Sequence, residues 1–339
     1  MLTHLQKRKK SAIIFLDEKS EDNMDNGLIQ ALLIGAIILL YTLQSLFSKM
    51  FNDAYPGDAK HSPDVFAVVS GAVVAVVSLF FSGFKFGPFR WETLLLGLIN
   101  AAILYGYDQC IIKASGKGPY SIMMVFSLGG GIVIPALAAL LPFYPFNKGV
   151  SVTQFVAIAI ICVAVYLASV KDDGSEAVSG KKPNLRLFFI LSALLALCNG
   201  LYGVMFVVQE GVTGVADKQL YVIYTFMGAA IISAVRLFAT EKKKVLLPFK
   251  QNKKSFLYLM LAAVVSAMAV NVLVLLVGVV NETILYTFDN AGVMLLSALA
   301  SAFIFKDKLS QKNVIGCIIM TLALVMMGAS ATIDGWLFG

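Results

Sequence analysis

Two polar residues inside a largely apolar run are the strongest candidates for chemistry. Asp289 and Asn290 lie about two helical turns from the start of residues 284–305. A carboxylate surrounded by lipid costs on the order of a few kcal/mol unless it faces protein or water, finds a partner or takes up a proton. We therefore predict that Asp289 and Asn290 help to bind a solute, and that Asp289 couples its movement to protons.

A second group of polar residues falls in the apolar run 93–113. Asn100, Tyr107 and Asp108 share one arc of a helix in this run. Asp108 is the sharpest candidate of the three, although its place near the helix end also allows pairing with Lys113 or with lipid headgroups. The other candidates lie beside these residues or in other apolar runs: Tyr105, Gln109, Tyr286, Gln44, Asn199, Tyr202 and Asn271. For the last four, an interhelical hydrogen bond is the simpler explanation of each residue alone.

Three consecutive glycines precede a proline in the apolar run 120–141. Gly129, Gly130 and Gly131 end four residues before Pro135. Bare backbone followed by a residue without an N–H group predicts a helix break, a feature that transporters use to bind polar solutes. Close helix packing or a simple kink explains the same residues equally well.

The elements that must position these residues are membrane helices. The chain of 339 residues is 59% hydrophobic and 14% charged, with a mean hydropathy of 0.83. A soluble domain of this length carries far more charge. Each membrane crossing needs about 20 apolar residues, and an α-helix satisfies its own backbone in lipid. We predict an all-α integral membrane protein with ten transmembrane helices at 28–50, 64–84, 93–113, 120–141, 152–170, 185–208, 219–239, 256–280, 284–305 and 314–333.

A polar linker separates two halves of five predicted helices each. An ungapped offset that aligns the apolar runs of the halves pairs Gly131 with Asn290. An alignment shifted by three residues pairs Gly130 with Gly292 instead. The sequence therefore predicts a repeated order of helices but not which residues correspond. The predicted organisation is a polar N-terminal tail at 1–27, a first repeat at 28–170, a linker at 171–184 and a second repeat at 185–333.

The second half also carries the local features of a known family. They are the turn Phe305-Lys306-Asp307-Lys308-Leu309-Ser310 and the following Val314-Ile315-Gly316. With the two five-helix halves and the internal Pro135, these features resemble the drug/metabolite transporter superfamily, especially its EamA-like permeases, over about residues 28–333. The family commonly has Leu-Gly-Glu-x-Leu-Ser at the turn, so Lys306 and Asp307 depart from the pattern. The resemblance implies two inverted repeats, a central cavity lined by helices 1, 3, 6, 8 and 9, and alternating access.

The predicted function is secondary transport of a small polar or amphipathic metabolite across the cytoplasmic membrane, with export favoured. Proton coupling through Asp289, assisted by Asp108, is a hypothesis, and substrate exchange or uptake remain alternatives. A structural or sensory membrane protein and an intramembrane enzyme are the alternatives of other classes. The sequence has no phosphate-binding loop, metal-ligand spacing or catalytic constellation, so we predict no enzyme, cofactor or metal. Expected partners are the solute, the bilayer and protons, without nucleic acid, in a monomer or homodimer.

The orientation of the predicted helices is open. With ten spans, the face opposite the N-terminal tail carries twice as many lysines and arginines as the face with the tail. The positive-inside rule then places the termini outside the cell, whereas the family resemblance implies cytoplasmic termini.

Overall fold

The computed structural model describes residues 27–85, 89–115, 120–141, 150–169, 185–213, 217–240, 244–300 and 311–338. These ranges are helical apart from turns and one isolated bridge between Val277 and Val280, which confirms the all-α class. Most of the N-terminal tail, the linker at 171–184 and most of the turn after residue 305 lie outside the described residues. The helices are α2 (Gly27–Ala54), η2 (Ala59–His61), α3 (Ser62–Phe81), α4 (Trp91–Ser115), α5 (Tyr120–Ala138), α6 (Val152–Ser169), α7 (Leu185–Thr213), α8 (Lys218–Thr240), η4 (Lys244–Leu246), α9 (Leu247–Gln251), α10 (Lys253–Leu276), α11 (Glu282–Ala300), α12 (Gln311–Gly328) and α13 (Ser330–Phe338).

Several of these helices are suited to a bilayer. By length and composition, α2, α3, α7, α8 and α10 can each cross a membrane, and α12 with α13 makes a sixth crossing if the bent pair is one span. Their outward faces carry large apolar side chains such as Leu32, Phe80 and Val235, each more than three-fifths exposed. An apolar surface of this extent is stable against lipid rather than water. The chain is therefore a membrane protein with several apolar helices.

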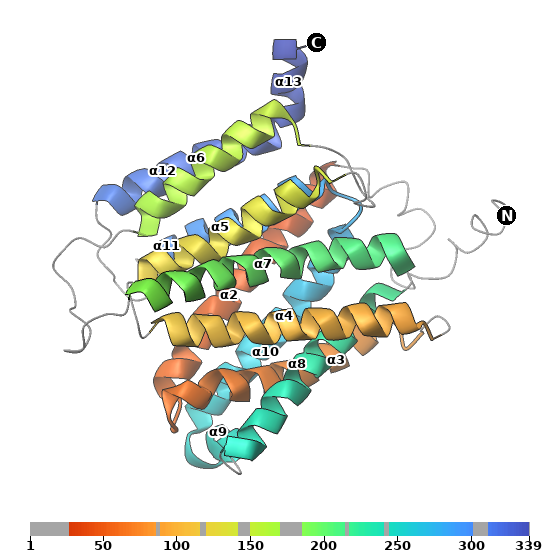
Figure 1. Ribbon diagram of the computed structural model, residues 1–339, viewed down its shortest axis with the longest axis vertical. Coiled ribbons are helices and arrows are strands. Elements are labelled where there is room, and N and C mark those ends of the chain that lie inside the picture. Colours follow the sequence, from red (N-terminus) through yellow and green to blue (C-terminus); the bar gives the residue numbers. More distant parts are fainter. Residues whose placement is uncertain are drawn as a thin grey trace.

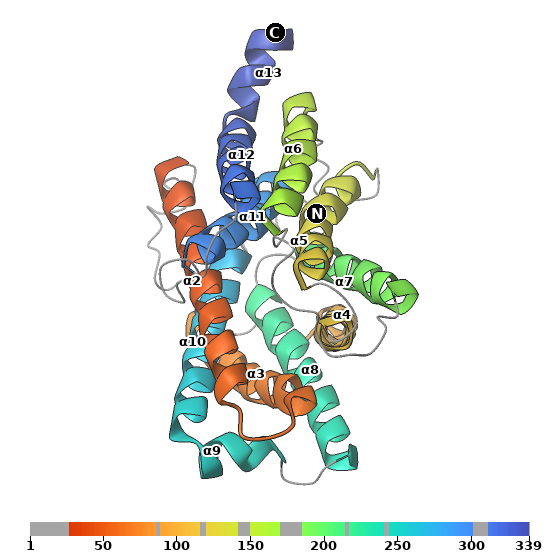
Figure 2. The same cartoon turned by 90° about the vertical axis from the view of Figure 1, so that its left-hand side faces the viewer.

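The two largest apolar cores among the described residues lie toward opposite ends of the bundle. In Figures 1 and 2, α6 and α12 lie at one end of the bundle, and α3 and α8 lie toward the other, with α9 beyond. The first core joins α7, α8 and α10 through residues such as Phe206, Tyr221 and Val270. The second joins α5, α6 and α12 and contains Ile161 and Met320. Between the cores, α11 packs on both α2 and α5, which places its polar residues inside the bundle.

Helix α5 runs without interruption through the three glycines and Pro135, so the predicted helix break is not found. Pro135 lies one turn before the last residue of the helix, where its missing N–H group removes a single backbone hydrogen bond. The close-packing explanation applies to Gly130 and Gly131. A Cβ atom on Gly130 would lie 2.5 Å from the Cα atom of Ala196 in α7, and one on Gly131 would lie 2.6 Å from Nδ2 of Asn199.

This close approach predicts a large difference between neighbouring glycines. Gly130→Ala forces apart the backbones of α5 and α7, and we expect a lower melting temperature in detergent, equivalent to about 1–3 kcal/mol. The control is Gly129→Ala, because a Cβ atom there meets nothing within 4 Å and alanine favours the helix. Equal melting temperatures for the two variants would contradict the packing of α5 on α7.

The last predicted helix is two helices. Instead of one span at 314–333, α12 ends at Gly328, and α13 begins at Ser330 after a bend of 69°. The bend is held by α6, whose first turn has backbone N–H groups without helical partners. Oδ1 of Asp334 accepts hydrogen bonds from the Thr153 hydroxyl at 2.6 Å and from its backbone N–H at 3.3 Å. The eighth predicted helix is shifted toward the N-terminus, since α10 begins at Lys253 rather than at residue 256 and ends at Leu276 rather than at residue 280.

Candidate functional site

The centre of the candidate site is the crossing of α5 and α11. Because Pro135 has no N–H group, the carbonyl of Gly131 one turn earlier lacks its helical donor. Asn290 supplies a donor instead: its Nδ2 atom lies 3.4 Å from the Gly131 oxygen and 2.9 Å from the Tyr286 oxygen. The amide of Asn290 thereby joins the two helices where the backbone of α5 is bare.

Helix α7 adds a second amide to this crossing. Nδ2 of Asn199 donates to the side-chain oxygen of Asn290 at 3.1 Å and to the backbone oxygen of Ser127 at 2.8 Å. The hydroxyls of Ser127 and Tyr107 are 3.3 Å apart, which brings α4 into the same network. The hydroxyl of Tyr286 donates to the Gly203 carbonyl of α7 at 2.8 Å. Four helices therefore meet through hydrogen bonds, and we call these groups the central network.

Two carboxylates stand beside the central network. Asp289 and Asp108 are only half-buried, although both lie on helices within the bundle. Among the described residues, neither has a hydrogen bond or an ion pair. Tyr202 of α7 lies within electrostatic reach of both carboxylates, and Tyr41 of α2 lies within reach of Asp289. The two acids thus share one neighbourhood with tyrosine hydroxyls, an arrangement that can bind a polar solute or carry a proton.

The other predicted site residues lie elsewhere. Asn100 is fully buried beside Tyr221 of α8. Asn271 makes an interhelical hydrogen bond, from Nδ2 to the Ser78 hydroxyl at 2.9 Å. The Gln44 side-chain oxygen is buried without a hydrogen-bond partner in the described part of the chain. Tyr105 is half-buried and has no hydrogen bond to the central network within the described ranges.

Three ion pairs near the helix ends were not anticipated from the sequence. Asp64 lies 3.2 Å from Nη1 of Arg236, and it also accepts a hydrogen bond from the predicted site residue Gln109. At other helix ends, Asp217 pairs with Arg90 at 3.5 Å, and Glu210 pairs with Lys218 at 2.6 Å. One signal was available: Arg236 falls inside the seventh predicted helix, where a charge requires a partner.

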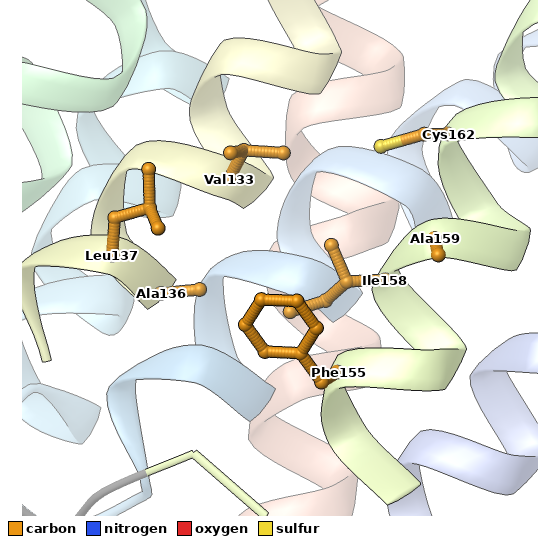
Figure 3. A pocket seen from close by; sticks show the side chains of 7 residues that line it. All are labelled: Val133, Ala136, Leu137, Phe155, Ile158, Ala159 and Cys162. Carbon is orange, nitrogen blue, oxygen red and sulfur yellow. The ribbon is translucent and has the colours of Figure 1, made fainter. Parts of the chain in front are cut away.

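No metal site accompanies these groups in the described residues. No group of three or more His, Cys, Asp or Glu side chains is placed there to hold a metal ion. An apolar groove of about 210 Å³ lies between α5 and α6, with Leu137 and Phe155 at its exposed side (Figure 3). Its lining contains no candidate residue and consists of Val133, Ala136, Leu137, Phe155, Ile158, Ala159 and Cys162.

Among known proteins, the chain is similar to a solved structure in its fold. No protein-family model matches the chain, and no curated protein matches it. A solved structure described as "Crystal structure of protein" is similar, with a TM-score of 0.68 and 14% sequence identity. The likeness covers 88% of this chain and 97% of that one. The arrangement of helices is therefore shared with an experimentally determined protein.

Proposed function

We propose that this protein is a secondary transporter that moves a small polar or amphipathic solute across the cytoplasmic membrane, as an exporter, by alternating access. In this proposal ten helices cross the bilayer as two inverted five-helix repeats, α2 to α6 and α7 to α12, in the manner of EamA-like permeases. The solute binds at the central network, and the halves rock about it.

The pattern of helix packing supports two equivalent halves. In chain order, and leaving out the short α9, the counterparts of α2, α3, α4, α5 and α6 are α7, α8, α10, α11 and α12. The contact of α2 with α10 then corresponds to that of α7 with α4, and the contact of α3 with α10 corresponds to that of α8 with α4. The contact of α2 with α11 likewise corresponds to that of α7 with α5. The remaining large contacts join counterpart helices directly: α3 with α8, α5 with α11 and α6 with α12. A two-fold relation between the halves produces these exchanges.

Contacts between individual residues agree with this relation. Gly131 and Asn290, which are counterparts in the ungapped alignment, touch each other, as residues close to a two-fold axis do. Gly130 packs on Ala196 of α7, and Gly292 packs on Ile38 of α2. Gly130 and Gly292 are counterparts in the alignment that is shifted by three residues, and the helices that they contact, α7 and α2, are counterparts as well. Both registers therefore find support in different parts of α5 and α11.

The observation that carries the transport proposal is Asp289, which stands beside the central network with no ion pair or hydrogen bond among the described residues. A carboxylate in the middle of a membrane protein is costly without a partner, and such groups mark solute or proton pathways. The hydrogen-bonding groups around it come from both proposed halves, through Asn199 and Asn290 in one and Gly131 in the other. Relative movement of the halves would alter these contacts and with them the affinity for a solute.

Transport can be tested before the solute is identified. Purified protein is screened by thermal shift against amino acids, sugars and nucleosides, and compounds that stabilise it are tested for counterflow in proteoliposomes. We expect at least one compound to exchange faster than in protein-free liposomes, and a proton gradient to drive its accumulation. Counterflow that ignores the gradient would indicate a substrate exchanger. Absence of flux for every stabilising compound would favour a structural or sensory protein.

A further inference from the structure

An ion pair joins the two proposed halves at one end of α3. Asp64, in the first turn of α3, is 1% exposed and contacts Arg236 near the end of α8, with Nη1 at 3.2 and 3.4 Å from its two oxygens. Nε2 of Gln109, near the end of α4, donates to the same carboxylate at 3.3 Å. A buried carboxylate with one charged partner loses most of its compensation if that partner moves away.

A matching ion pair lies at the other end of α3. Asp217, directly before α8, is 3% exposed and contacts Nε of Arg90, directly before α4, at 3.5 Å. The Thr93 hydroxyl in the first turn of α4 donates to the same carboxylate at 3.2 Å. Arg90 also donates to the backbone oxygen of Thr213 at the end of α7. Each pair thus joins a buried acid at the start of α3 or α8 to an arginine from the other half.

The two pairs are separated by the thickness of a membrane. Helices α3 and α8 are antiparallel, because Asp64 at the start of α3 contacts Arg236 near the end of α8, while Gly71 in the middle of α3 packs on Phe226 in the middle of α8. The 19 residues from Asp217 to Arg236 rise about 28 Å along α8. The hydrocarbon core of a bilayer is about 30 Å thick. In a bilayer crossed by α8, one ion pair would therefore lie at each membrane face.

Helix α4 connects both ion pairs with the candidate site. It contacts Asp217 through Thr93 at its start and Asp64 through Gln109 near its end, and Gln109 directly follows Asp108. We propose that Asp64–Arg236 and Asp217–Arg90 are the two gates of alternating access, of which one breaks while the other holds. This inference rests on the proposed transport function. Both pairs are formed in the structure, as expected of an occluded conformation.

Gates of this kind predict opposite effects from equivalent substitutions. Asp64→Asn weakens the pair at the face where α3 begins and favours conformations open to that face. Asp217→Asn weakens the other pair and favours the opposite opening. A substitution shifts the equilibrium between two conformations only if it changes their free energies by different amounts. Each variant weakens an ion pair that is formed in one conformation and broken in the other.

The test measures access to the site from each side. A reporter cysteine is introduced by Tyr202→Cys in the full chain, with serine in place of Cys110, Cys162, Cys198 and Cys317. A membrane-impermeant maleimide is added to right-side-out and inside-out vesicles. We expect Asp64→Asn to raise labelling from one side, and Asp217→Asn from the other, by about fivefold or more. The double variant Asp64→Arg/Arg236→Asp restores the ion pair, so it should label like the unmodified reporter.

Controls separate the gates from the transport function. Lys60→Met removes the exposed ion pair with Asp58 just before α3, and labelling should stay unchanged. Labelling that rises from the same side in both gate variants, or in neither, would overturn the gates even if wild-type protein shows solute counterflow. Conversely, opposite labelling shifts would support the gates even if the solutes in the counterflow panel are not transported.

Discussion

Lys218→Met is expected to lose about 3–5 kcal/mol of stability, the largest effect on folding among the substitutions considered. Nζ of Lys218 lies 2.6 Å from the Glu210 carboxylate and donates to the Val277 carbonyl at 2.8 Å. Both charged side chains are more than nine-tenths buried. Methionine keeps most of the volume of lysine but leaves the Glu210 charge buried without its cation. Thermal and denaturant unfolding of the purified protein in detergent measure the loss.

The surrounding backbone is built around this pair. Gly278, with a φ angle of +80°, lies in the left-handed region that favours glycine. A Cβ atom there would also collide with the Glu210 carboxylate. Because the loop after α10 fits closely around this carboxylate, it leaves little room for water to replace Lys218 beside Glu210. The double variant Lys218→Met/Glu210→Gln removes both charges, and it should be more stable than Lys218→Met alone.

An exposed ion pair provides the matched control. Lys60 and Asp58 are 2.9 Å apart, with about half of each side chain exposed. Solvent screens exposed ion pairs, so they contribute little to stability and Lys60→Met should unfold close to wild type. If Lys218→Met lost no more stability than Lys60→Met, the Glu210–Lys218 pair would not be a buried stabilising contact.

Asp289→Asn is expected to abolish the pH dependence of solute flux in proteoliposomes, the largest effect on transport. Asparagine preserves the size and polarity of the side chain, but it can neither release nor accept the proton that the proposed coupling requires. The flux of a solute identified by thermal shift is measured between about pH 6 and 8 with and without a proton gradient. Retained binding with proton-independent flux is the expected result.

Two further variants sharpen the assignment. Asp58→Asn removes an acid outside the spans, and hydrogen bonds from Lys60 hold the pKa of Asp58 below its usual value. Asp58 therefore stays ionised over this pH range, and its replacement should leave the pH profile unchanged. A profile that survives in Asp289→Asn but disappears in Asp108→Asn would transfer the coupling role to Asp108.

Patterning alone predicted much of this architecture. Long apolar runs indicated helices because only an α-helix pairs all its backbone N–H and C=O groups within one continuous segment in lipid. The internal alignment also singled out Gly131 and Asn290, which are in contact. The sequence was misleading at Pro135, which suggested a break. The lost backbone hydrogen bond is replaced by Asn290 from a helix far along the chain, and local rules do not include such a donor.

Tertiary pairing explains the remaining differences. Arg236 and Asp64 are 172 positions apart, so composition and periodicity give no sign that they meet. Tyr41 was not among the predicted site residues, because its place near Asp289 depends on how α2 packs on α11. The bend after Gly328 is likewise set by the hydrogen bond between Asp334 of α13 and Thr153 at the start of α6. Each of these features depends on a partner that is distant in sequence.

The bend between α12 and α13 has a consequence for how the protein sits in its membrane. With α12 crossing the bilayer as proposed, α13 is turned 69° from it and runs nearly parallel to the bilayer plane, and Figure 1 shows α13 leaving the bundle beside α6. Trp336 on this helix is 87% exposed, and tryptophan side chains favour the headgroup layer. The C-terminal helix would therefore lie at the water–lipid boundary and fix the depth of α6 and α12 in the bilayer.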